Sequence, residues 1–119
     1  MNFLAVFVGG GLGSLSRYLL GLFISKIDWP NFPLATFLAN ILACSILALT
    51  LFFLKDKLEQ SSALALLIIT GFCGGFSTFS TFSLETVQLI QQGNSLWAIL
   101  NVAISLIFGI GIIWLLKTT

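Results

Sequence analysis

The sequence has no histidine, only two cysteines and very little charge. Charged side chains make up 8% of its 119 residues, against about 25% in an ordinary soluble domain. Five basic and four acidic residues cannot cover the surface of a soluble fold, so that class is excluded. A net charge of +1 offers no basic surface, and no nucleic-acid partner is expected. Zinc sites and histidine-based acid–base catalysis have no ligands to work with, and no enzyme activity is expected.

Apolar residues dominate what is there: they make up 58% of the chain, and the mean hydropathy is +1.11. This composition excludes disorder and indicates an integral membrane protein. A bilayer core about 30 Å thick requires roughly 20 apolar residues per helix. Four stretches meet this length, at about residues 3–24, 34–54, 62–90 and 96–116. Because the connectors are short, the sequence predicts one all-α domain of four transmembrane helices over residues 1–119.

The basic residues are almost evenly divided between the two sides of such a bundle. One side would carry Lys55, Lys57 and Lys117, and the other Lys26 and Arg17. Orientation normally follows the excess of Lys and Arg on the cytoplasmic side. Two interpretations stay open: weaker signals select one orientation, or the chain inserts both ways and can form an antiparallel dimer.

The third apolar segment is too long for one straight span. Its 29 residues would form a helix of about 43 Å, well beyond the hydrocarbon thickness. Gly71, Gly74 and Gly75 weaken its middle, because glycine costs about 1 kcal/mol relative to alanine in a helix. We therefore expect a break at Gly74-Gly75, with freed backbone groups that face protein, water or an ion. The alternative is close helix packing on small residues, which the spacing of Gly9 and Gly13 in the first segment also permits.

Polar and aromatic side chains alternate after these glycines. Phe79 and Phe82 lie three apart and share a helical face with nearby hydroxyls. A phenyl ring has a positive edge that can favour an anion, although phenylalanine in a membrane helix often serves packing alone.

Further polar residues lie within the other apolar segments. Asn40, Asn101 and Ser105 can donate hydrogen bonds to an ion or across helices. Arg17 is the most costly residue at membrane depth; it would either draw anions into a vestibule or snorkel to the interface as an anchor. Glu85 could pair with Arg17 or with a surface lysine.

Three strings together resemble the CrcB/Fluc family of fluoride channels. They are GFCGGFSTFSTF at residues 71–82, GGGLGSLSRY at 9–18 and TFLAN at 36–40. The resemblance extends over the whole chain in length, helix number and motif order. It implies a dual-topology, antiparallel homodimer in a prokaryotic plasma membrane, the inner membrane of a Gram-negative cell, with two passive fluoride pores.

The resemblance also implies roles for individual residues. Those assigned to the fluoride pore are Phe79, Phe82, Asn40, Ser80, Thr81, Asn101 and Ser105. Arg17 would lie in the vestibule, and the backbone carbonyls of Gly74 and Ser77 would hold a structural sodium ion between the subunits. The chain departs from the family at Ser77-Thr78, where Thr-Thr is usual, and at Asn101, where many members have tyrosine.

Neutral donors suit fluoride, which is strongly hydrated and is costly to strip of water without replacement partners. Several weak sites also let the ion leave. The main alternative function is a small proton-coupled multidrug exporter, which typically requires a carboxylate in its first helix; this chain has none there. A structural membrane subunit is a third possibility, but it would require neither the glycine break nor the dense hydroxyls.

Overall fold

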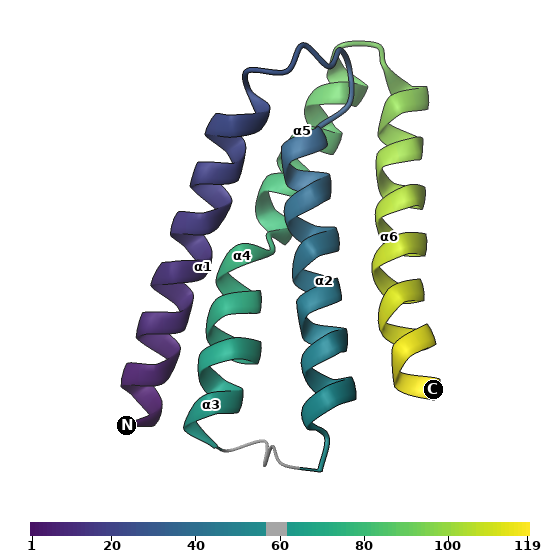
Figure 1. Ribbon diagram of the computed structural model, residues 1–119. Helices are drawn as coiled ribbons and strands as arrows, with labels where there is room; N and C mark the ends of the chain where they lie inside the picture. The colour runs from purple at the N-terminus through teal and green to yellow at the C-terminus, as the bar shows by residue number, and fades with distance from the viewer. Residues whose placement is uncertain (57–61) are drawn as a thin grey trace.

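The computed structural model describes residues 1–56 and 62–119, and within them every regular element is helical. The elements in chain order are α1 (Asn2–Ile24), α2 (Leu34–Leu54), α3 (Ala63–Ala65), η1 (Leu66–Cys73), α4 (Gly74–Phe76), α5 (Phe79–Gln91) and α6 (Ser95–Thr118). The four elements α3, η1, α4 and α5 follow one another as a single long segment (Figure 1).

Four helical segments are long and apolar enough to cross a membrane, which confirms the predicted four-span, all-α fold. Each begins and ends within two residues of its predicted span. Both termini lie at the same end of the bundle (Figure 1), as an even number of spans requires. Of the basic residues used in the orientation argument, Lys57 lies outside the described residues.

The first and third spans are in backbone contact through glycines. A Cβ added to Gly9 or Gly13 on α1 would overlap the carbonyl oxygen of Leu67 or Phe72. A Cβ on Gly71 would lie 2.9 Å from the Gly9 Cα. Only glycine permits this approach, so the alternative interpretation of these residues, close packing on small residues, holds for α1 and the first half of the third span.

The third span is broken, as predicted, but the predicted position is wrong. Gly74 and Gly75 are helical, and the helix ends at Phe76. The extended residues are Ser77, with ψ 159°, and Thr78, with φ −152° and ψ 121°. Thr78 then caps α5, because its side chain accepts a hydrogen bond from the Thr81 N–H. The break therefore occurs where hydroxyl residues can satisfy backbone groups, while Gly71 and Gly75 before it lie against α1.

The small buried core lies beside this break. Ala39, Ala43 and Phe76 form its centre, and Leu20 and Phe72 pack against it. Large apolar side chains such as Phe3 and Trp114 are instead exposed along the outer surface. Exposure of large apolar side chains is expected where lipid, rather than water, surrounds the helices.

Candidate functional site

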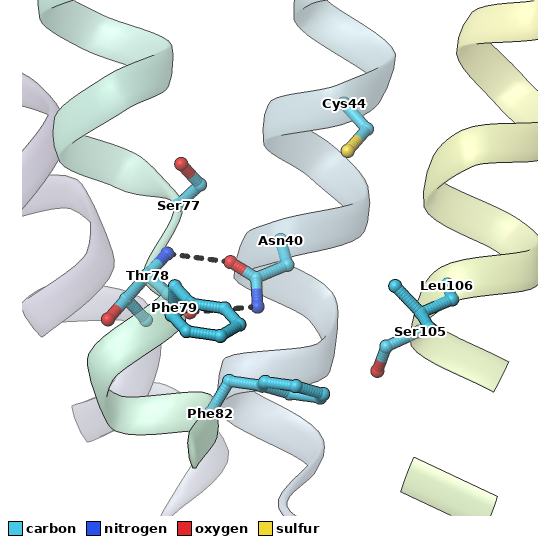
Figure 2. Close-up of a pocket in the computed structure, with 8 residues that line it drawn as sticks. All are labelled: Asn40, Cys44, Ser77, Thr78, Phe79, Phe82, Ser105 and Leu106. Atoms are coloured by element: carbon cyan, nitrogen blue, oxygen red, sulfur yellow. Dashed lines mark hydrogen bonds between the residues drawn. The ribbon is translucent and has the colours of Figure 1, made fainter. Parts of the chain in front are cut away.

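A cavity of about 240 Å³ lies at the break in the third span. Its walls come from α2, the break, the start of α5, and α6 (Figure 2). The residues that line it are Asn40, Cys44, Ser77, Thr78, Phe79, Phe82, Ser105 and Leu106. No charged side chain is among them, so the cavity can hold an ion only through neutral dipoles and ring edges.

Asn40 holds the break open by pairing with the backbone of Thr78. Its Oδ1 accepts a hydrogen bond of 2.7 Å from the Thr78 N–H, and its Nδ2 donates one of 3.2 Å to the Thr78 carbonyl (Figure 2). The amide carries two N–H donors, and among the described residues only one bond from Nδ2 is formed. Asn40 therefore supplies both the backbone partners that the break lacks and a neutral donor.

The same bonds release two carbonyls of the third span. In a continuous helix the Thr78 and Thr81 N–H groups would bond the carbonyls of Gly74 and Ser77. Here the first donates to Asn40 and the second to the Thr78 hydroxyl, at 3.2 Å. Among the described residues, the carbonyls of Gly74 and Ser77 thus lose these helical partners and can accept another. Gly74 is also open, since an added Cβ would meet nothing within 4 Å.

Two phenylalanine rings stand at the start of α5. The centroids of Phe79 and Phe82 are 6.1 Å apart and their planes are inclined by 36°. Both side chains lie along the cavity near Asn40 (Figure 2). Phe79 is 81% exposed, which is unusual for a residue at such a site. Its ring therefore presents most of its surface to whatever covers this face of the chain.

A chain of hydrogen bonds connects α5 to α6 behind the cavity. The Thr86 hydroxyl donates to the Phe82 carbonyl at 2.7 Å and accepts from Asn101 Nδ2 at 3.0 Å. Ser105 in turn donates to Asn101 Oδ1 at 3.4 Å. Asn101 is 1% exposed and does not line the cavity, whereas Ser105 does.

A second pocket of about 320 Å³ lies between α1, α2 and α5. Its lining residues are Ser14, Arg17, Tyr18, Gly21, Ala35, Thr36, Thr81 and Glu85. The Thr36 hydroxyl donates to Glu85 Oε1 at 2.9 Å. The other carboxyl oxygen, Oε2, is buried and has no hydrogen-bond partner in the part of the chain that the structure describes. Arg17 and Glu85 thus share one polar pocket at membrane depth.

The predicted site residues fall into three groups. Asn40, Phe79, Phe82 and Ser105 meet in the first cavity together with Ser77. Arg17 and Thr81 line the second pocket. Ser80 and Asn101 line neither; Ser80 is exposed and lies 3.3 Å from the Thr78 hydroxyl. Whether each residue contacts an ion stays a prediction.

Sequence reasoning missed two threonines that hold the polar groups in place. Thr36 belongs to the string at residues 36–40, but its partner Glu85 is 49 positions away. Thr86 resembles any helical threonine in the sequence, and only the approach of α6 reveals its bond to Asn101. The position of Thr36 four residues before Asn40, on one helix face, was the available signal for the first.

Comparison with known proteins gives one consistent family. The model of the family described as "CrcB-like protein, Camphor Resistance (CrcB)" matches residues 4–116. A protein of Hydrogenobaculum sp. named "Fluoride-specific ion channel FluC" is 46% identical over 98 residues, which are 82% of this chain and 80% of that protein. The "Fluoride-specific ion channel FluC 1" of Yersinia pestis is 46% identical over 107 residues, covering 87% and 84% of the two chains. A protein of Flavobacterium psychrophilum, also named "Fluoride-specific ion channel FluC", is 42% identical over 90% of this chain and 86% of that protein.

Proposed function

The chain belongs to the CrcB family, and from that premise we propose that it is a fluoride-selective ion channel. The observation that carries the proposal is the uncharged cavity at the break, lined by one amide, several hydroxyls and two phenyl rings. Relatives of this similarity are named for fluoride conduction. Fluoride would lose its water here to neutral donors and ring edges, which bind weakly enough to release it.

The path for the ion uses both pockets. Arg17 would draw fluoride into the pocket it shares with Thr81 and Glu85, without meeting it in the narrow part. Asn40, Phe79, Phe82 and Ser105 would then hold it in the cavity at the break. Ser80, exposed beside Thr78, would contribute a hydroxyl at the surface that a partner covers. Flow is passive and runs down the fluoride gradient.

The working unit is a homodimer of antiparallel subunits with two pores. Its support is the exposure of three residues around the break, Gly74, Phe79 and Ser80, of which the Phe79 ring is 81% exposed. Free carbonyls facing lipid would cost several kcal/mol each. A second, inverted copy would cover them, and the even division of basic residues permits both orientations. The dimer would reside in a bacterial plasma membrane, surrounded by the lipid bilayer.

A sodium ion fits the dimer axis in this arrangement. The free carbonyls of Gly74 and Ser77 are hard oxygen ligands of the kind that sodium prefers, and two antiparallel copies would supply four. The ion would join the subunits and add positive potential between the pores. The replacement of threonine by Ser77 leaves the carbonyl ligand unchanged.

The competing function is a proton-coupled small multidrug exporter. The described part of α1 has no carboxylate, and Glu85 on α5 is held by Thr36 beside Arg17. A cationic drug would be repelled there, so this function is disfavoured.

Fluoride efflux from proteoliposomes tests the proposal. Vesicles are loaded with potassium fluoride and diluted into fluoride-free buffer. Once valinomycin is added, they should lose their fluoride within the response time of a fluoride electrode. Chloride-loaded vesicles should retain their chloride, and a pH gradient should not change the fluoride rate. Equal chloride efflux, or a rate that requires the pH gradient, would contradict the proposal.

Topology has its own test at the end of α5, where the connector to α6 begins. Gln91 and Gln92 are exposed and uncharged, so replacing both by lysine should force one orientation and reduce flux about tenfold or more. The matched control replaces both by glutamate, which contributes little to orientation. Equal flux in the two variants would remove the argument for insertion both ways.

A further inference from the structure

Three hydrogen bonds connect the Phe82 carbonyl, Thr86, Asn101 and Ser105 behind the cavity. The Phe82 carbonyl determines which group donates and which accepts in each of them. A carbonyl only accepts, so the Thr86 hydroxyl must donate to it, over 2.7 Å. The Thr86 oxygen is left as an acceptor and takes the Asn101 Nδ2 hydrogen. This fixes the orientation of the Asn101 amide. Its Oδ1 lies toward Ser105, one turn further along α6, and can only accept the Ser105 hydrogen.

The consequence falls on the cavity. Ser105 has one hydroxyl hydrogen, and in this arrangement it is directed to Asn101, 3.4 Å away. Its lone pairs therefore face the cavity that it shares with Asn40 and Phe82. A lone pair repels an anion, so Ser105 can donate to fluoride only after its hydrogen has turned away from Asn101.

The opposite arrangement uses the same three side chains. If the Thr86 hydroxyl turns to Asn101 and the amide rotates by half a turn, Nδ2 donates to Ser105. The Ser105 hydrogen is then free to point into the cavity. The Phe82 carbonyl keeps its helical partner, the Thr86 N–H, so the reversal does not leave this carbonyl unpaired. The change needs only rotation of the side-chain groups, and no proton is transferred between atoms.

We propose that Thr86, Asn101 and Ser105 form a reversible hydrogen-bond relay that switches Ser105 between facing the cavity with a lone pair and facing it with a hydrogen. The inference rests on the proposed fluoride function, and it makes Thr86 and Asn101 positioning residues. The long Ser105–Asn101 distance of 3.4 Å is the weakest bond of the relay, so the switch opens there. An arriving fluoride selects the donor state because it gains a hydrogen bond only in that state.

Thr86→Val tests the relay because valine keeps the shape and removes the hydroxyl that orients Asn101. Freed from α5, the amide can turn to Ser105, and we expect fluoride flux to rise about two- to tenfold, the range of one neutral hydrogen bond. Thr50→Val is the matched control, since Thr50 makes the same 2.7 Å bond to the carbonyl four residues earlier, on α2. It should leave flux unchanged, and Thr86→Ser should restore the original rate.

The double variant separates a relay from simple loss of packing. Thr86→Val should have no effect on flux when Ser105 is already alanine, because no hydroxyl is left to switch. An equal effect of Thr86→Val in both backgrounds, or an effect no larger than that of Thr50→Val, would overturn the relay.

NMR of the asparagine side chains tests the relay independently of transport. In protein labelled with ¹⁵N-asparagine, both Thr86→Val and Ser105→Ala should shift the Asn101 amide signal, whereas Thr50→Val should not. Absent fluoride flux with both shifts present would refute the proposed function and leave the hydrogen-bond chain intact. An Asn101 signal that neither variant moves would refute the relay whatever the flux.

Discussion

The two halves of the third span differ in what they contact and how. The first half, α3 to α4, approaches α1 so closely that Gly9, Gly13 and Gly71 leave no room for a methyl group. The second half, α5, contacts α2 and α6 through side-chain amides and hydroxyls. One segment thus contains a closely packed scaffold followed directly by a polar site. The break at Ser77-Thr78 is the boundary between them, which is why the scaffold can hold the site at membrane depth.

The largest expected effect comes from breaking the scaffold. Gly13→Ala would place a methyl group against the Phe72 carbonyl, so α1 must move away from the third span. Such overpacking costs about 1–3 kcal/mol or more, and we expect loss of the folded protein in detergent. Thermal unfolding followed by tryptophan fluorescence measures this. Gly11→Ala is the control: its Cβ meets nothing within 4 Å, so a similar loss there would contradict the account.

Removing the amide at the boundary should leave the scaffold folded and stop conduction. Asn40→Ala deprives Thr78 of partners for both its N–H and its carbonyl. Each unpaired buried group costs about 1–3 kcal/mol, and the cavity also loses its amide donor. We expect fluoride efflux to fall about a hundredfold, as measured with a fluoride electrode.

Ser45→Ala is the control for that variant. Ser45 is also polar and on α2, but it bonds only its own helix, at the Ile41 carbonyl. Its efflux should match the original protein. If Asn40→Ala conducts equally well, the break does not depend on the amide and the site must be placed elsewhere.

A smaller effect is expected from the rings alone. Phe82→Ile, and separately Phe79→Ile, should slow fluoride efflux about three- to tenfold, if the edge of a ring interacts with the ion about as strongly as with a second ring, where the contact is worth roughly 0.5–1.5 kcal/mol beyond its area. The melting temperature should stay within a few degrees of the original, since neither ring lies in the buried core. Phe53→Ile, at an exposed position on α2, provides the comparison. Unchanged rates in both pore variants would remove the ring-edge argument.

The smallest effect should come from the vestibule. Thr36→Val removes the hydroxyl that donates to Glu85 Oε1. Because Oε2 already lacks a partner among the described residues, neither carboxyl oxygen of Glu85 would then be hydrogen-bonded there. We expect a two- to fivefold change in efflux at low fluoride, which corresponds to roughly 0.5–1 kcal/mol, the lower part of the net range for one hydrogen bond. Thr36→Ser keeps the hydroxyl and should behave as the original. Equal rates for serine and valine would show that Glu85 does not need this bond.

The four spans and the break could be predicted because they depend on local properties of the sequence. Apolar runs of bilayer length fixed the helix ends to within two residues. The twelve-residue string at 71–82 identified the family that the comparison then confirmed. Asn40, Phe79 and Phe82 line one cavity, and their role in a fluoride pore stays a prediction.

What could not be predicted depends on contacts between distant segments. Gly74-Gly75 has the local composition of a break, but the third span stays helical there, as π-helix η1 followed by α4, where it packs against α1. The break shifts to Ser77-Thr78 because Asn40, 38 positions away, supplies the missing backbone partners. Thr36 with Glu85, and Thr86 with Asn101, likewise depend on helix register that a single sequence does not contain.

The most direct test of the central claim is a reversal potential across a planar bilayer. With the purified protein, sodium fluoride on one side and an equal concentration of sodium chloride on the other, only a pore that discriminates between the two anions generates a large potential, and its sign tells which anion permeates. We predict a potential whose sign corresponds to fluoride leaving its own side, unchanged when a pH gradient is imposed. A potential near zero, or one that follows the pH gradient, would contradict the account.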